Sequence, residues 1–179
     1  MTDVVIENIV ASAQVSNGFD IEILSEKMPG SSYNPDEFDG LTMKFDQPKV
    51  AVLVLSTGKL ICTGGKSIEE TNISIEKGVK KIKDAGAGTK KTYKIEVENI
   101  IASTDFKKGL NLEHASKSLP LKNVDYKPKD FPGLIYRTDG AVLLLFSSGR
   151  AVCTGTKSID EASKAIKMIE EKLTSIGVL

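Results

Sequence analysis

The sequence has few of the side chains that most often build catalytic or metal centres. Its 179 residues include no tryptophan, one histidine and two cysteines. His114 has no second histidine with which to share a metal, so we interpret it as a surface or packing residue. Cys62 and Cys153 could pair or bind a metal, but we interpret both as small buried side chains on strands. We therefore expect no catalytic residue, no metal, no cofactor and no enzyme activity.

The sequence also lacks net charge and long apolar runs. It carries 24 basic and 24 acidic residues, so a polyanionic partner has to meet a local basic patch rather than a global field. Apolar runs such as Ala141 to Phe146 are too short to span a bilayer. The first ten residues, MTDVVIENIV, contain no cationic segment of a signal peptide. Two cysteines without a secretory signal indicate a reducing, intracellular compartment.

What the sequence does contain is an internal repeat. STGKLICTGGKS, Ser56 to Ser67, returns as SSGRAVCTGTKS, Ser147 to Ser158, with seven of twelve positions identical at a shift of 91 residues. The same shift aligns IENIVAS with VENIIAS, and a shift of 93 aligns YNPDEFDGL with YKPKDFPGL. Two copies are too few for a solenoid. We expect a single pseudo-twofold domain, with repeat one in residues 1–90 and repeat two in residues 91–179.

Each repeat predicts the element order β–α–β–β–β–β–α. In repeat one, Ile6 to Ser12 alternates as a strand does, and Asp20 can cap a short helix. SIEE, Ser67 to Glu70, is a capping box before a long amphipathic helix that ends near Gly86. Repeat two has the corresponding signals.

The repeated CTG-x-KS segment could alternatively be interpreted as a nucleotide-binding loop. The pattern G-x-x-x-x-G-K-[ST] needs a glycine where this chain has Leu60, and in the second copy Thr156 precedes Lys157. The segment therefore does not predict a phosphate-binding loop.

The central hairpin of each repeat has two different faces. One is wholly apolar, which suits contact with the helices. The other is apolar at its centre and bordered by Lys59, Thr63, Arg150 and Thr154, and a contiguous exposed apolar surface usually marks a binding site. Branched apolar side chains with a rim of cations suit the DNA minor groove, where sugars and base edges lie inside and phosphates outside. A dimer interface is the alternative, and a homodimer without DNA is compatible with DNA binding.

These motifs resemble the TATA-box-binding protein family across essentially the whole chain. The resemblance is carried by ENIV and ENIIAS, YNPDEF and YKPKDFPGLIYR, QPKVAVLVLSTGK and AVLLLFSSGR, and the two CTG-x-KS segments. It implies an α+β fold, a pseudo-twofold saddle of one curved antiparallel sheet with helices on the convex face. The chain begins almost at its first strand, as in archaeal members, which implies the cytoplasm of an archaeal cell (the nucleus in a eukaryote).

The resemblance also implies a role for each residue of the exposed face. The wedges that enter base steps fall at Phe38, Leu55, Phe131 and Phe146. Contacts with base edges are implied for Asn8, Asn99, Val10, Ile101, Thr63 and Thr154. The apolar floor is implied for Leu53, Ile61, Leu144 and Val152. Phosphate contacts are implied for Lys44, Lys59, Arg137, Arg150, Lys66 and Lys157.

One wedge departs from the family pattern, which has phenylalanine at all four positions. Leu55 can enter a base step but cannot stack on a base, so we expect a weaker kink on that side. The loops that carry the first wedge of each repeat are contact points for transcription factor B in the family. The loop residues here are Asp36, Glu37, Lys127 and Lys129. Family members usually have acidic residues at the two lysine positions.

The function implied is a general transcription initiation factor. It would bind the TATA element of double-stranded DNA in the minor groove, kink it with apolar wedges, and recruit transcription factor B and, indirectly, RNA polymerase. A diverged paralogue, acting as a regulator or protein-interaction module with weak TATA binding, is the alternative. A small-molecule carrier that uses the exposed apolar face as a pocket is a third class.

Overall fold

The computed structural model describes residues 3–179. Over that range ten strands form one antiparallel sheet in the order β2-β3-β4-β5-β1-β6-β10-β9-β8-β7, accompanied by four α-helices and one 3-10 helix. The predicted combination of a single antiparallel sheet and helices is confirmed. No helix of the described residues is long and apolar enough to cross a membrane.

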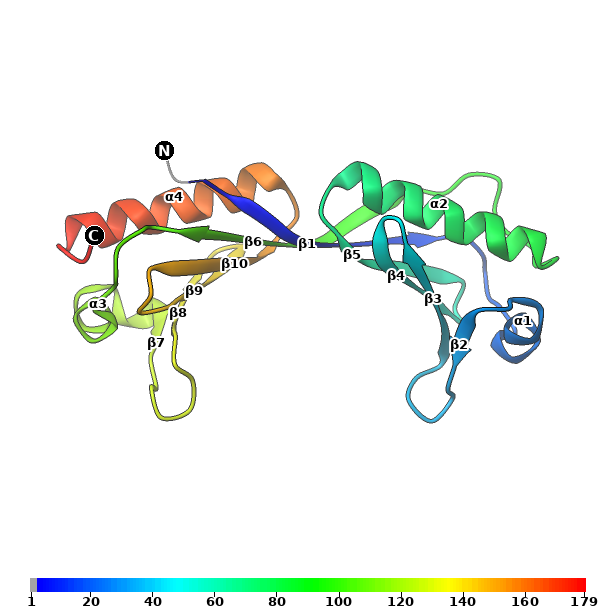
Figure 1. Cartoon of the computed structure of the whole chain (residues 1–179), viewed down its shortest axis with the longest axis horizontal. Coiled ribbons are helices and arrows are strands. Elements are labelled where there is room, and N and C mark those ends of the chain that lie inside the picture. Colours follow the sequence, from blue (N-terminus) through cyan, green and yellow to red (C-terminus); the bar gives the residue numbers. More distant parts are fainter. Residues whose placement is uncertain (1–2) are drawn as a thin grey trace. The chain divides into compact units, whose positions relative to one another are not determined.

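The two halves of the chain follow the same order of elements (Figure 1). The first half contains β1 (Val5–Gln14), α1 (Ile21–Lys27), β2 (Ser31–Tyr33), β3 (Gly40–Asp46), β4 (Lys49–Leu55), β5 (Lys59–Gly65) and α2 (Ile68–Asp84). The second half contains β6 (Ile95–Asp105), α3 (Leu112–Ser118), η1 (Leu121–Asn123), β7 (Val124–Asp125), β8 (Leu134–Thr138), β9 (Ala141–Leu145), β10 (Arg150–Thr156) and α4 (Ile159–Ser175). The predicted order β–α–β–β–β–β–α is confirmed in the first half, and the second half adds η1 to it.

The long helices begin and end at the signals that the sequence carries. The Ser67 hydroxyl accepts a hydrogen bond from the Glu70 amide at 3.1 Å, and the Glu70 carboxylate accepts one from the Lys66 amide at 3.1 Å. In a capping box the glutamate would accept from the amide of the N-cap residue itself, Ser67; here it accepts from the amide of the preceding residue, Lys66. α2 ends at Asp84 and Ala85 caps it; Gly86 follows with a φ of 86°, a left-handed conformation that glycine adopts without strain.

Packing divides the described chain into two compact units. Unit 2 is Asn8–Glu98, and unit 1 is Asn99–Leu179 together with residues 3–7. The division falls inside two strands, β1 and β6, rather than in a loop. Each unit therefore takes the first residues of a strand from the other sequence repeat.

This exchange is visible in the cores. Val4 and Ile6 pack against the core of unit 1, whereas Tyr93 and Ile95 pack against the core of unit 2. The sequence similarity between Ile6 to Ser12 and Val97 to Ser103 therefore spans residues that belong to different cores.

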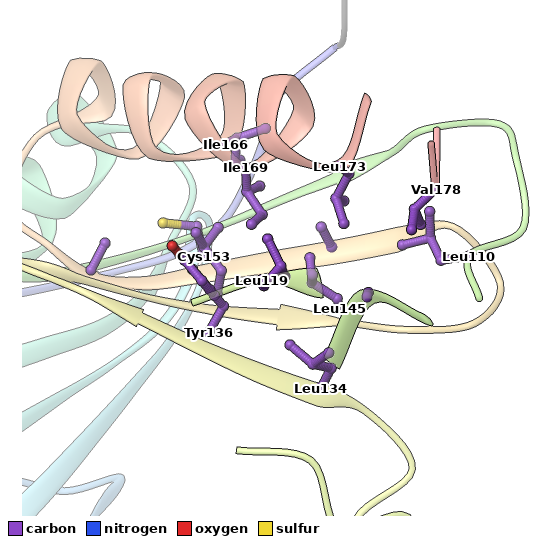
Figure 2. Close-up of a cluster of buried hydrophobic side chains, with 14 of the residues drawn as sticks. Leu110, Leu119, Leu134, Tyr136, Leu145, Cys153, Ile166, Ile169, Leu173 and Val178 are labelled. Carbon is purple, nitrogen blue, oxygen red and sulfur yellow. The ribbon is translucent and has the colours of Figure 1, made fainter. Parts of the chain in front are cut away.

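In each unit the core lies between the sheet and the long helix. Figure 2 shows this for unit 1, where Ile166, Ile169 and Leu173 point from α4 toward side chains of the strands. Leu145 of β9 and Cys153 of β10 are fully buried beneath them. The apolar face of each hairpin is thus the face that the helix covers, as predicted.

Candidate nucleic-acid interface

The face of each unit that points away from its long helix carries rows of side chains in register across neighbouring strands. We call it the open face. In unit 2 the rows are Lys44–Ala51–Thr63 and Thr42–Leu53–Ile61. In unit 1 they are Arg137–Val142–Thr154 and Ile135–Leu144–Val152. The apolar members are half-buried, while their neighbours along each strand, on the helix side, are buried.

The open faces therefore combine an apolar floor with a polar border. Leu53 and Ile61 lie directly opposite each other in unit 2, as Leu144 and Val152 do in unit 1. All four residues predicted to form the floor are thus brought together in pairs. The alternation of two faces along each hairpin, predicted from the sequence, is confirmed.

A polar pair stands at one end of the floor in each unit. Asn8 Nδ2 donates to Thr63 Oγ1 at 3.1 Å, and Asn8 Oδ1 accepts from the Gly64 amide at 2.7 Å. In unit 1, Asn99 Nδ2 lies 3.0 Å from Thr154 Oγ1 and Asn99 Oδ1 lies 2.7 Å from the Gly155 amide nitrogen. A backbone N–H needs an acceptor, so it orients the amide with its nitrogen toward the threonine.

Val10 and Ile101 lie two residues beyond these asparagines on β1 and β6 and are half-buried. The six residues predicted to read base edges thus form two matched sets, one in each unit. An asparagine NH₂ group has two N–H donors, and the contact with threonine uses one of them.

At the other end of each floor a cation is paired with a glutamate. Arg150 Nη2 lies 3.1 Å from Glu7 Oε1 in unit 1, and Lys59 Nζ lies 3.5 Å from Glu98 Oε1 in unit 2. The same glutamates accept hydrogen bonds from the buried serines Ser103 and Ser12, respectively.

Sequence reasoning missed both glutamates. Glu7 and Glu98 are each followed directly by one of the two predicted asparagines, in the repeated segments I-E-N and V-E-N. That recurrence was the available signal. A glutamate has no role in the predicted set of phosphate-binding cations, so that set offered no reason to include either one. The structure nevertheless places Glu7 and Glu98 on the open faces, beside Arg150 and Lys59.

A carboxylate with no counterpart in unit 2 lies beside Arg150. Asp105 stands opposite Arg150 in the β6–β10 register, where unit 2 has Gln14 opposite Lys59. The Lys107 amide and ammonium hydrogen-bond Asp105, and with the charge of Arg150 they hold the pKa of its carboxyl below the usual range. Asp105 thus stays ionised at the edge of the open face of unit 1.

The predicted wedges are arranged differently in the two units. In unit 1 the rings of Phe131 and Phe146 meet edge to face, with centroids 5.9 Å apart and planes at 67°. A Cβ on Gly133 would lie 2.7 Å from Phe131 Cε1 and 3.1 Å from Phe146 Cε1. Glycine is therefore required for both rings to lie where they do.

In unit 2 only one aromatic ring, that of Phe38, lies over the corresponding glycine, Gly40. A Cβ on Gly40 would lie 2.5 Å from Phe38 Cε2, so this ring also lies over a glycine. Leu55 occupies the position that corresponds to Phe146, next to Gly40 in the β3–β4 register. Asp39, beside the wedge, accepts a hydrogen bond from the Ser56 hydroxyl. Both glycines were missed from the sequence, because a glycine after a loop does not reveal which ring covers it.

The other four predicted phosphate-binding cations lie at two different places in each unit. Lys44 and Arg137 lie at the outer end of the first row, on β3 and β8, and are exposed. Lys66 and Lys157 directly precede Ser67 and Ser158, which cap the long helices. The structure thus places Lys44 and Arg137 on the open faces, and Lys66 and Lys157 directly after β5 and β10.

Metal-binding residue types do not form a site within the part of the chain that the structure describes. Over residues 3–179 no group of three histidine, cysteine, aspartate or glutamate side chains is placed to hold a metal ion. Cys62 and Cys153 are free and buried, and burial raises the pKa of each thiol to about 11. His114 is exposed, and its Nε2 lies 3.0 Å from the carbonyl oxygen of Ile176.

Known proteins resemble the chain over nearly its whole length. A TATA-box-binding protein of Archaeoglobus fulgidus is 40% identical over 176 residues, which cover 97% of this chain and 96% of that one. A TATA-box-binding protein of Pyrococcus horikoshii is 42% identical over 176 residues, 97% of this chain and 91% of that one. Among solved structures, Methanococcus jannaschii TBP matches with a TM-score of 0.85 and 36% identity, covering 97% of this chain and 99% of that chain.

The family model described as transcription factor TFIID (or TATA-binding protein, TBP) matches the chain twice, over residues 3–85 and 94–176. The two matches coincide with the two repeats found in the sequence. Together with the relatives and the shared fold, they show that the chain belongs to the TATA-binding protein family.

Proposed function

We propose that this protein is a general transcription initiation factor that binds the TATA element in the minor groove of double-stranded DNA. The observation that carries the proposal is the open face of each unit, with paired apolar floor residues, an Asn–Thr pair at one end and a wedge at the other. Such a face offers apolar contact to sugars and base edges together with amide donors.

The Asn–Thr pairs support a preference for A·T over G·C base pairs. In the minor groove, adenine N3 and thymine O2 are acceptors at similar places, whereas guanine adds an amino donor. The second N–H of Asn8 or Asn99 suits an acceptor. The branched side chains of Val10 and Ile101 leave little room for the guanine amino group. The pairs would therefore select A·T base pairs without distinguishing A·T from T·A.

The wedges support binding to bent rather than straight DNA. An apolar side chain that enters a base step costs unstacking energy, which an aromatic ring returns in part by contact with a base. Flexible steps such as TA cost least to open, so deformation adds to sequence preference. Phe131 and Phe146 would open one step in this way, and Phe38 with Leu55 another.

The cations support contact with phosphates. If all six predicted lysines and arginines, namely Lys44, Lys59, Lys66, Arg137, Arg150 and Lys157, neutralised one phosphate each, log K would fall with log salt at a slope of about −5. Since Arg150 and Lys59 are paired with Glu7 and Glu98, DNA has to replace or share these partners. A measured slope smaller in magnitude is therefore expected.

Recruitment of transcription factor B, and of RNA polymerase through it, forms the second part of the proposal. The family resemblance supports it, and the loops that carry Phe38 and Phe131 have exposed charged residues available for a protein partner. We place the protein in the cytoplasm of an archaeal cell. Without DNA, the open apolar faces would also support a homodimer.

One observation favours the alternative of a diverged paralogue that binds TATA DNA weakly. Leu55 stands where unit 1 has Phe146, so unit 2 lacks the ring pair. A regulator with one strong wedge would bind A·T-rich DNA with reduced bending while retaining protein contacts.

A gel-shift titration on an A·T-rich promoter duplex tests the proposal, with a G·C-rich duplex of equal length as control. Wild type should bind the A·T-rich duplex preferentially and bend it, as measured by fluorescence transfer between the duplex ends. Phe131→Ala and Phe146→Ala should reduce both affinity and bending. Equal binding of both duplexes by wild type contradicts the minor-groove assignment, and unchanged bending by both variants contradicts the wedge assignment.

A further inference from the structure

Two matched loops, Tyr33–Gly40 in unit 2 and Tyr126–Gly133 in unit 1, have the same backbone turn. The Phe38 amide donates to the Asn34 carbonyl at 3.3 Å, and the Phe131 amide donates to the Lys127 carbonyl at 3.0 Å. The residue before each phenylalanine donates to the same carbonyl, at 3.1 and 2.9 Å. Differences between the loops therefore come from their side chains.

Those side chains carry opposite charge. The loop of unit 2 has three carboxylates, Asp36, Glu37 and Asp39, and no cation. The loop of unit 1 has two lysines, Lys127 and Lys129, and one carboxylate, Asp130. All six side chains are exposed, and the matched positions 36 and 129 exchange an aspartate for a lysine.

The lysines are available to a ligand. Lys127 lies 3.8 Å from Asp125 and its side chain is 70% exposed, so this ion pair contributes little and can be given up. Figure 1 shows the loop between β7 and β8 extending away from the α4 side of unit 1. The lysines lie on the same loop as the wedge, because the Phe131 amide donates to the Lys127 carbonyl.

We infer that the Tyr126–Gly133 loop is a phosphate-binding element for the DNA next to the Phe131 wedge, and that the Tyr33–Gly40 loop is not. The inference rests on the proposed function. A wedge that enters a base step brings the flanking sugar-phosphate backbone up to its own loop, where Lys127 and Lys129 attract phosphates and Asp36 and Glu37 repel them.

A second, independent difference points the same way. Unit 1 has the aromatic wedge pair, and unit 2 has one ring and Leu55. Stacking of the two rings on bases and attraction between the loop lysines and flanking phosphates therefore both favour DNA binding by unit 1. A protein whose two units are alike in fold would bind its two DNA half-sites unequally, and this inequality gives the complex a direction on DNA.

The size of the effect follows from counterion release. Two additional phosphate contacts steepen the salt slope by about 2, so the affinity advantage that the loop provides should shrink about tenfold between 50 and 200 mM salt. Lysine contacts of this kind do not read bases, so the effect should be the same for different flanking sequences.

The experiment is a salt series of gel-shift titrations on one A·T-rich duplex with long flanks, using three double variants. Lys127→Gln with Lys129→Gln removes the loop lysines. Asn34→Lys with Asp36→Lys gives the unit 2 loop lysines at the two positions that match Lys127 and Lys129, and leaves Glu37 and Asp39 in place. Lys164→Gln with Lys167→Gln removes two exposed lysines from α4 of the same unit and controls for net charge.

We expect the first variant to lose affinity at low salt and to flatten the slope by about 2, and the second to gain affinity and steepen it. The α4 variant should behave as wild type. A hydroxyl-radical footprint should extend past the A·T core at one end for wild type, lose that extension in the first variant, and extend at both ends in the second.

If wild type binds the duplex and the first variant keeps its slope and footprint, the inference is wrong while the proposed function stands. Loss of binding to an acidic partner protein with unchanged DNA binding would likewise assign the lysines to that partner. If wild type does not bind A·T-rich DNA, the proposed function fails, and the inference fails with it.

Discussion

Arg150 Nη2 lies 3.1 Å from Glu7 Oε1, although 143 residues separate them in the sequence. The glutamate comes from the start of β1, and the arginine begins β10 of unit 1. Lys59 and Glu98 repeat the arrangement in unit 2 at 3.5 Å. Each open face therefore holds a carboxylate at a position where the proposed function needs a cation to meet a phosphate.

We predict that Glu7→Gln increases DNA affinity at low salt. The amide keeps a hydrogen-bond acceptor for Ser103 but no longer neutralises Arg150, so the salt slope should steepen by up to about 0.9. A salt series of gel-shift titrations measures this. Glu113→Gln, on the exposed side of α3, is the matched loss of one acidic charge and should leave the slope unchanged. Weaker binding by Glu7→Gln would show that Glu7 positions Arg150 for DNA.

Exchanging the residues at positions 55 and 146 should change the bend of bound DNA in opposite directions. Leu55→Phe gives unit 2 the pair that Phe131 and Phe146 form in unit 1, and stacking of one ring on a base contributes about 1 kcal/mol or more, roughly a fivefold gain in affinity. Phe146→Leu should lose a similar amount. Bend angles from fluorescence transfer check both variants. Opposite signs are required, and a loss for both would mean that Leu55 fits its base step better than a ring does.

Gly133→Ala should displace the wedges of unit 1 with little effect on its core. The new methyl group would meet the flexible rings of Phe131 and Phe146 at 2.7 and 3.1 Å and the backbone oxygen of Leu145 at 3.1 Å. We expect reduced bending and affinity, with a loss of about 1 to 2 kcal/mol in the free energy of unfolding. Ser148→Ala, in the exposed turn of the same unit, is the control. Wild-type bending by Gly133→Ala would contradict the role of the ring pair.

The two buried thiols should make the fold sensitive to alkali. Burial raises the pKa of Cys62 and Cys153 to about 11 from 9.0, so the unfolded chain releases these protons before the folded chain does. Their contribution to stability is present below pH 9 and is lost as the pH rises toward 11, at about 2 to 3 kcal/mol per cysteine. Urea unfolding over this range should show a shallower pH dependence for Cys62→Ala with Cys153→Ala than for wild type.

Local signals in the sequence predicted the elements because the interactions that form them are local. Ser67 and Glu70 are three residues apart, and the hairpin faces follow from alternation along single strands. The open faces could be predicted for the same reason, since a residue's place in its strand decides the face on which it lies.

The features that the sequence did not reveal depend on contacts between distant segments. Glu7 and Arg150 meet only because β1 enters the sheet of unit 1 at its start, and no local pattern records which strand lies beside which. Gly133 has a role only because two rings, one before it and one 13 residues after it, cover it in the folded chain. The similarity of the repeats also hides the exchange of strand segments between the units, because the division falls at matched positions in β1 and β6, before Asn8 and before Asn99.

That exchange gives a prediction of its own. Ile6 belongs to repeat one in sequence but packs against the core of unit 1, and Ile95 belongs to repeat two but packs against the core of unit 2. Ile6→Ala should therefore lower hydrogen-exchange protection within residues 99–179 and spare residues 8–98, and Ile95→Ala should do the reverse. Both side chains are half-buried, so each variant should lose about 1 to 2 kcal/mol. Loss of protection in the repeat that contains the mutated residue would show that the strands are not exchanged in solution.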